Sequence, residues 1–244
     1  LHSGDWIAHG DDEEEWDSQF FSWRSNIHYM QANLPINGCK GNHEQSGALF
    51  NKYWPYPYVS NFYWSFDYGP AHFAVVDVYT YYGTGSTQLQ WLENDLAATT
   101  KEWKFLLFHE PGYSAGGHAD NTSVQTYIQP LCEIYGVDIV FAGHNHYYAR
   151  ALVTGVYHIT TGGGGAPLHW PESGHRNVQK TSFTNHFCEV NIQGNSMDFT
   201  AINNSGAVSD EFSIENSQTG IRDVEYRISD KHIILFTPTP NPFN

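Results

Sequence analysis

Residues 137–146 read Val-Asp-Ile-Val-Phe-Ala-Gly-His-Asn-His, which is an apolar run followed by a glycine and two histidines. The run Val137–Ala142 predicts a strand buried on both faces, as in a parallel sheet covered on each side. We expect His144 and His146 in the loop just past this strand, where their imidazoles can diverge towards different ions. The alternative is a pair of core or surface histidines. The segment predicts a buried strand that delivers two ligand side chains at its end.

Three further signatures precede this segment along the chain. They are Gly4-Asp5, Gly41-Asn42-His43-Glu44, and His109 within Leu107-Phe108-His109-Glu110-Pro111. Each supplies a carboxylate, amide or imidazole beside a glycine or at the end of an expected strand. Hard-to-borderline divalent metals bind such oxygen and nitrogen ligands. Taken singly, Gly4-Asp5 or Gly41–Glu44 would indicate only a polar turn.

The four signatures, in this order and with these spacings, resemble the calcineurin-like metallophosphoesterases. Within that superfamily the chain is most similar to secreted purple-acid-phosphatase-like enzymes, over residues 1 to about 205. The resemblance implies an α/β fold, a four-layer αββα sandwich of two mixed sheets flanked by helices. It also implies two divalent or mixed-valence metal ions (Fe, Zn or Mn) and a small phosphoester substrate. A phosphomonoester attacked by metal-activated hydroxide is the first expectation; the alternatives are phosphodiesters or nucleotides, or a non-catalytic surface binding module.

The resemblance also implies how the ligands are shared between the two ions. Asp5 corresponds to the carboxylate that bridges both ions. His144 joins Asn42 and His109 on one ion, and His146 belongs to the other.

Two histidines are candidates for contact with the substrate. His43 stands beside Asn42 and cannot easily reach the same ion, so it is free for acid–base work. The resemblance implies that His43 contacts the substrate and protonates the leaving group. His118 follows His109 by nine residues in a glycine-rich loop. It either contacts the substrate or is an ordinary solvent-exposed histidine, and the sequence leaves both open.

The chain departs from the family pattern at two places. Ala8 stands where purple acid phosphatases carry a metal-ligating tyrosine, so a tyrosinate-ligated Fe(III) centre is not expected. The family's first motif, Asp-x-His, should precede Gly4 and does not. The sole Asp-x-His, Asp230-Lys231-His232, comes too late in the chain and is rejected. One ion is thereby left with Asp5 and His146, too few ligands for tight binding.

Composition excludes several classes of function. Eleven basic and 26 acidic residues give a formal charge of −15, which argues against a nucleic-acid partner. No stretch approaches the roughly 18 apolar residues of a membrane span.

The sequence indicates no oligomeric state. Cys39, Cys132 and Cys188 are odd in number and widely spaced, which favours three buried free thiols, with one disulfide as the alternative.

Both ends of the chain look cut, which favours a piece of a longer protein. We expect a metallophosphoesterase domain over residues 1–215, truncated at its N-terminus and with impaired activity. Residues 216–244 are expected to form a linker and the start of a C-terminal sorting domain of the kind that some bacteria use for secretion; an ordinary proline-rich linker is the alternative. The expected location is therefore secreted, periplasmic or at the surface of a bacterial cell.

Periodicity predicts the main elements. A helix is expected over residues 11–33, where Trp16, Phe20 and Trp23 begin an apolar stripe. The acidic residues 11–15 suit its N-terminus, with a metal site as the alternative. A second helix should begin after Ser86, and a third should span residues 123–135. The expected strands cover residues 34–39, 63–67 and 72–77 (the last two as a hairpin), 104–108, 137–142, 156–161, 187–192 and 197–202.

Overall fold

The computed structural model describes residues 1–21, 25–216 and 234–235. Its helices are α1 (Glu13–Glu15), α2 (Ser25–Asn33), α3 (Ala48–Tyr53), α4 (Thr87–Ala98) and α5 (Gln129–Tyr135), with π-helical turns η1 (Trp16–Phe20) and η2 (Val124–Ile128). The strands are β1 (Trp64–Tyr68), β2 (Ala71–Val75), β3 (Trp103–Leu107), β4 (Ile139–Ala142), β5 (Tyr148–Val153), β6 (Val156–Thr161), β7 (Val178–Ser182), β8 (His186–Gln193), β9 (Ser196–Asn203), β10 (Val208–Glu215) and β11 (Ile234–Leu235).

The strands form two sheets. The larger has seven strands in the order β1-β2-β3-β4-β6-β5-β7, and the second has four in the order β10-β9-β8-β11. Strands β2, β3, β4 and β6 run parallel in the centre of the larger sheet, and β1, β5 and β7 are antiparallel to their neighbours. Every residue of β2, β4 and β6 is buried. This burial explains why the run 137–142 predicted β4 correctly.

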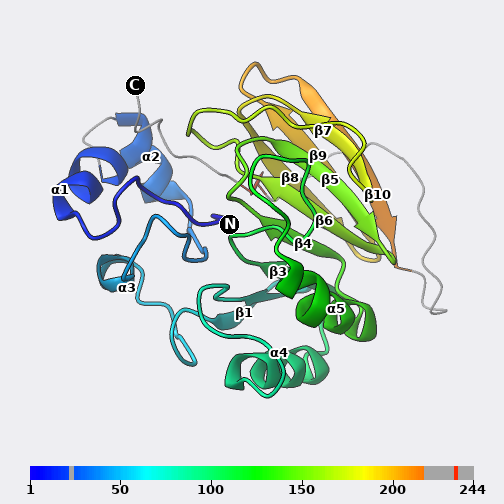
Figure 1. Ribbon diagram of the computed structural model, residues 1–244. Helices are drawn as coiled ribbons and strands as arrows, with labels where there is room; N and C mark the ends of the chain where they lie inside the picture. The colour runs from blue at the N-terminus through cyan, green and yellow to red at the C-terminus, as the bar shows by residue number, and fades with distance from the viewer. Residues whose placement is uncertain (22–24, 217–233, 236–244) are drawn as a thin grey trace.

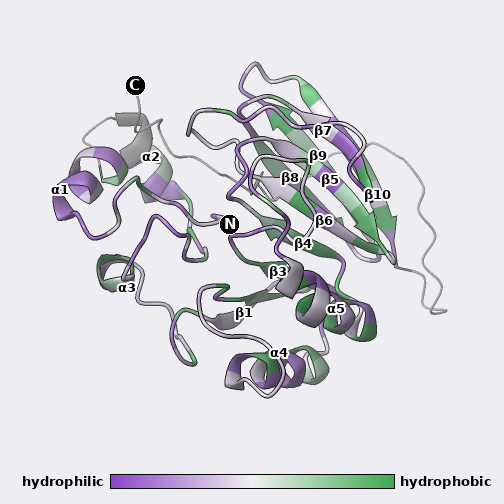
Figure 2. Ribbon diagram, viewed as in Figure 1, coloured by the Kyte–Doolittle hydropathy of each residue, from purple (hydrophilic) through white to green (hydrophobic). Residues whose placement is uncertain are grey.

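Helices and the second sheet cover opposite faces of the larger sheet (Figure 1). On one face, Leu92 and Leu96 of α4 pack in a cluster with Leu106 and Val140. The other face carries aromatic side chains that meet those of the second sheet, such as Phe199 of β9. Figure 2 shows hydrophobic residues on strands such as β4 and β10 and also on the helices α4 and α5. The α/β architecture of two sheets flanked by helices is confirmed.

The predicted helix over residues 11–33 is wrong as a single element. It is divided into α1, the π-helical turn η1 and α2, with residues 22–24 outside the described part of the chain. The Phe21 amide bonds the Trp16 carbonyl (2.8 Å), and Phe21 then leaves helical geometry at φ −90° and ψ 21°. Trp16 and Phe20 are still buried, in an aromatic cluster with Trp6 and Phe50. Burial of these first two residues of the stripe therefore survives although the helix is broken.

Of the other predicted helix ends, hairpins and strands, some are confirmed and others are wrong. The hydroxyl of Ser86 accepts from the Leu89 amide (3.1 Å) at the start of α4, and Gly136 ends α5 with φ 66°. The β1–β2 and β8–β9 hairpins are confirmed. The strand expected over residues 34–39 is reduced to one bridge between His2 and Gly38. Strands β5, β7 and β10 were not predicted.

All three cysteines are buried and free, as predicted. In the described residues no helix combines the length and apolarity that crossing a bilayer demands. The boundary between residues 215 and 216 stays a prediction. Apart from Asn216 and the two residues of β11, the expected linker and sorting segment lie outside the described residues, as does Asp230–His232.

His72 forms a pH-sensitive link between the β1–β2 hairpin and α4. Its Nδ1 lies 2.8 Å from Asp67 and its Nε2 lies 2.8 Å from Asp95. Burial lowers the pKa of His72, but hydrogen bonds and charges from Asp95 and Asp67 outweigh burial and raise it. Because the pKa of His72 is higher in the folded state, protonated His72 stabilises the fold. This contribution is complete below the unfolded-state pKa of about 6.5 and is lost as the pH rises through the folded-state pKa.

His72→Gln should therefore cost about 2 kcal/mol of unfolding free energy near pH 6, and clearly less near pH 9. Urea unfolding of both proteins at the two pH values measures this. His175→Gln is the matched control, because His175 forms only an exposed ion pair with Glu172 (3.2 Å) and should change little at either pH. A cost for His72→Gln that stays constant or grows with pH would contradict this account.

Candidate metal centre

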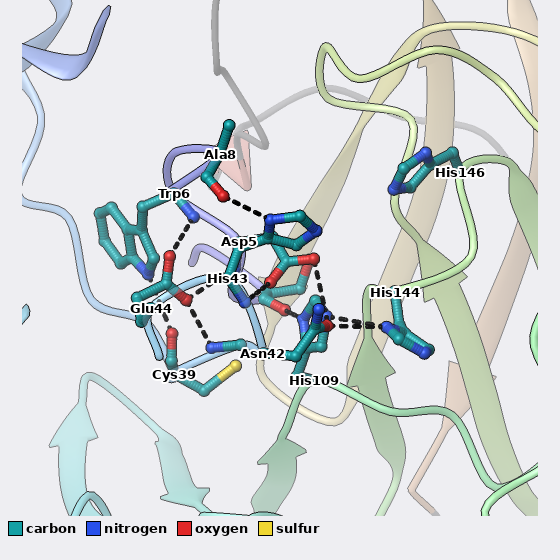
Figure 3. A network of polar contacts seen from close by, with 12 residues as sticks. Asp5, Trp6, Ala8, Cys39, Asn42, His43, Glu44, His109, His144 and His146 are labelled. Carbon is teal, nitrogen blue, oxygen red and sulfur yellow. Dashed lines mark hydrogen bonds and ion pairs between the residues drawn. The ribbon is translucent and has the colours of Figure 1, made fainter. Parts of the chain in front are cut away.

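Four of the five predicted ligands, Asp5, Asn42, His109 and His144, meet at one end of the larger sheet (Figure 3). His109 follows the end of β3 by two residues, and His144 follows the end of the adjacent parallel strand β4 by two. Asp5 and Asn42 come from two segments that run side by side, joined by the bridge between His2 and Gly38. The carboxyl ends of neighbouring parallel strands are where α/β sheets usually place their ligand sites.

Four donor atoms converge at this point. His109 Nε2 lies 3.0 Å from Asp5 Oδ2 and 3.1 Å from Asn42 Oδ1. His144 Nδ1 lies 3.1 Å from Asn42 Oδ1 and 3.2 Å from His109 Nε2. A tetrahedral ion with nitrogen and oxygen ligands at about 2.0–2.2 Å would separate its donors by about 3.3–3.6 Å. The observed spacing is close to that of one coordination shell.

The electrostatics of the cluster favour a cation. His109 Nδ1 donates to the carbonyl of Ser3 (2.7 Å), which turns Nε2 towards Asp5 and Asn42. Burial lowers the pKa of His109, but the charge and hydrogen bond of Asp5 outweigh it and raise this pKa, and a bound cation would replace the proton on Nε2. Burial and the neighbouring His109 lower the pKa of His144 to about 3, which keeps this imidazole neutral. Two neutral imidazoles, an amide oxygen and a carboxylate are a donor set typical of zinc and similar ions. The residues present therefore fit a divalent metal.

Asp5 is held in its ionised form. Burial raises its pKa, but the charge and hydrogen bond of His109 outweigh this and hold the pKa well below its usual range. The His43 amide adds a hydrogen bond to Asp5 Oδ1 (3.0 Å). An ionised carboxylate is the form that a metal requires.

The backbone is strained at two of the ligands. Asp5 has φ 56° and His144 has φ 63°, a left-handed conformation that costs about 1–3 kcal/mol per non-glycine residue. Gly4 beside Asp5 has φ 88°, and a Cβ there would come within 2.5 Å of His109 Nδ1. The Gly-Asp signature thus reflects a close approach that glycine alone allows. Strain of this kind gathers at functional sites.

Glu44 joins the two N-terminal ligand segments, a role that the sequence did not reveal. Its side chain is fully buried and accepts hydrogen bonds from the amides of Asp5 (3.0 Å), Trp6 (2.7 Å) and Gly41 (2.6 Å). Burial and the charge of Asp5 raise the pKa of Glu44. The glutamate of Gly-Asn-His-Glu therefore orients the ligand segments and does not face the donor cluster itself.

The two candidate substrate contacts lie beside the cluster. His43 Nδ1 bonds the carbonyl of Ala8 (2.6 Å), which leaves Nε2 without a recorded partner among the described residues. The ring of His118 stacks on that of His144, with centroids 4.0 Å apart. Ala8 thus has a structural task, since its carbonyl orients His43.

His146 occupies a different position from the other ligands. It lines the same hollow as Asp5, His109 and His144, but it is outside their compact group. Its Nδ1 bonds the carbonyl of Pro167 (2.8 Å), and its ring stacks on that of His169 at 4.2 Å. Its role as a ligand of a second ion stays a prediction.

Known proteins of one family resemble this chain over its N-terminal part. The model of the calcineurin-like phosphoesterase family matches residues 1–148. Purple acid phosphatase 18 of Arabidopsis thaliana is 34% identical over 152 residues, which cover 52% of this chain and 35% of that protein. Purple acid phosphatase 22 of the same plant is 34% identical over 163 residues, covering 56% and 38%. The chain therefore matches little more than a third of the length of these relatives.

Solved structures share the fold. A purple acid phosphatase from yellow lupin seeds superposes with a TM-score of 0.60 at 24% identity, covering 75% of this chain and 38% of that one. GAP50, the anchor in the inner membrane complex of Plasmodium, gives a TM-score of 0.66 at 14% identity, covering 90% and 77%. At these identities the likeness concerns the fold alone.

Proposed function

The chain belongs to the calcineurin-like phosphoesterase family, and from this premise we propose that it hydrolyses phosphoesters at a metal centre held by Asp5, Asn42, His109 and His144. The observation that carries the proposal is the convergence of four donor atoms at 3.0–3.2 Å around a carboxylate and two imidazoles. His109 is buried, Asp5 and His144 are half-buried and Asn42 is exposed, so the donors are accessible to an incoming ion. The strain at Asp5 and His144 supports the same conclusion.

The side chains around the centre have separate tasks. A divalent ion bound there would neutralise phosphoryl oxygens and lower the pKa of a water molecule. His43, oriented through Ala8, presents Nε2 either to a phosphoryl oxygen or, as an acid, to the leaving oxygen. His118 lies against His144 and can contact the same phosphoryl group. A second ion would use Asp5 together with His146.

We propose phosphomonoesters as the preferred substrates, with phosphodiesters as the alternative. A bound ion is also what draws an anionic substrate to a chain with a formal charge of −15. Pocket shape decides between the two substrate classes, so the preference needs a direct assay.

The test uses the 244-residue chain stripped with a chelator and reloaded with Zn²⁺, Mn²⁺ or Fe²⁺. Bound metal is measured after dialysis, and turnover is followed with p-nitrophenyl phosphate and bis-p-nitrophenyl phosphate. We expect hydrolysis that disappears with the metal, returns on reloading and is faster for the monoester. His144→Ala should lose both metal and turnover, and His175→Ala should keep both. Equal turnover with and without metal, or none under any loading, would refute the proposal.

A further inference from the structure

We propose that Asn145 and Tyr147 are positioning residues that fix the loop carrying His118 against the metal centre. The proposal rests on the proposed function for its catalytic consequence. The structural part of the proposal rests on contacts between residues 145–147 and residues 115–118.

Asn145 is fully buried and holds His118 by its backbone. Its side-chain oxygen accepts from the His118 amide (2.7 Å), and its side-chain nitrogen donates to the His118 carbonyl (3.3 Å). A Cβ on neighbouring Gly117 would come within 2.6 Å of that oxygen, so the loop can approach only with glycine there. One side chain thus clamps both polar groups of the residue whose ring lies on His144.

Tyr147 holds the preceding part of the same loop. Its hydroxyl accepts from the Ala115 amide (2.8 Å) and donates to the Gly116 carbonyl (2.7 Å). The Tyr147 side chain is also fully buried. Asn145 and Tyr147 together satisfy four backbone groups in four consecutive residues, 115–118.

The segment 144–147 therefore alternates between two tasks. His144 and His146 line the hollow at the metal centre, whereas Asn145 and Tyr147 hold the His118 loop. His144 and the two residues that hold the His118 loop belong to the same four-residue segment. This segment therefore keeps the ring of His118 stacked on that of His144, with centroids 4.0 Å apart. A histidine on a glycine-rich loop would otherwise have to be ordered at each binding event, which costs conformational entropy. The loop histidine is in this way pre-organised for a phosphoryl group.

The first experiment is a double-mutant cycle on the metal-loaded chain. Asn145→Ala should lower kcat/KM by about 10–100-fold, the size expected when a contacting group moves by about 1 Å. Bound metal should not change. Combined with His118→Ala, the same substitution should cause little further loss, because its effect passes through His118.

Two matched variants separate positioning from general destabilisation. Tyr147→Phe keeps the ring and removes only the hydroxyl, so it tests the proposal even if Asn145→Ala folds poorly. Asn191→Ala removes another nearly buried asparagine (9% exposed), on β8 of the second sheet, and should leave kcat/KM unchanged. The proposal would be overturned if Asn145→Ala lost the metal. It would also be overturned if Asn145→Ala lowered kcat/KM by the same factor in the wild-type chain and in the His118→Ala variant.

The second experiment does not need turnover. Hydrogen exchange of the His118 amide should accelerate by about tenfold or more in Asn145→Ala, because its acceptor is removed, and should not change in Asn191→Ala. If the wild-type chain hydrolyses no phosphoester, the proposed function fails and exchange alone decides the positioning role. Unchanged exchange at residues 115–118 in both Asn145→Ala and Tyr147→Phe would refute it.

Discussion

Asp5→Asn should lower kcat by about 10³-fold or more, because it removes the charge that holds the metal centre together. Within the compact donor group of the described residues, Asp5 is the sole carboxylate. Asparagine preserves its size and can still accept from the His43 amide. The substitution leaves two neutral imidazoles and two amides, which are a much weaker ligand set for a divalent ion. We expect bound metal to fall on dialysis in parallel with kcat.

Asp11→Asn is the matched control for this result. Asp11 is exposed and begins the acidic run 11–15, whose alternative interpretation was a metal site. Its neighbour Asp12 caps the amide of Glu14, which supports the helix-start interpretation. Asp11→Asn should therefore leave metal content and kcat as in the wild type. If the Asp5→Asn variant retains the metal and its kcat is normal, the metal centre must lie elsewhere.

Some strands could not be predicted from the sequence because they contain buried polar side chains whose hydrogen-bonding partners are far away along the chain. Arg150 of β5 is buried, and its Nε lies 2.6 Å from Asp210 of β10, which also accepts from the Tyr148 hydroxyl (2.7 Å). Each residue alone breaks the apolar pattern that indicates a buried strand. The partners are 60 residues apart, so only the folded chain shows that each satisfies the other.

The candidate site was more predictable than these strands. Ligand types beside glycines and at strand ends are local features, and Asp5, Asn42, His109 and His144 do come together. The supporting residues were not predictable. Glu44 bonds the amide of Trp6, 38 residues away, and nothing in its own neighbourhood indicates this. The metal ligands follow from a pattern of residue types, whereas their support follows from the three-dimensional path of the chain.

His43→Ala should lower kcat by about 10²–10⁴-fold with bound metal unchanged. The ring bonds the Ala8 carbonyl through Nδ1 (2.6 Å), which makes Nδ1 the donor and leaves Nε2 for the substrate. His43 is outside the compact donor group, although its amide bonds Asp5. That backbone contact survives the substitution, so the ligand geometry should persist. Metal analysis after dialysis and kcat on the same preparation give the two measurements.

A neighbouring histidine provides the control that makes this result specific. His9 follows Ala8 directly, is exposed and pairs with Glu15 (2.6 Å) at the surface. His9→Ala removes an imidazole from the same segment and should leave kcat unchanged, since an exposed pair of this kind contributes little. If His43→Ala instead loses the metal, His43 is a ligand, and the task of the proton donor must pass to another group such as His118. If kcat falls equally in both variants, the loss reflects the segment's conformation and not the chemistry of His43.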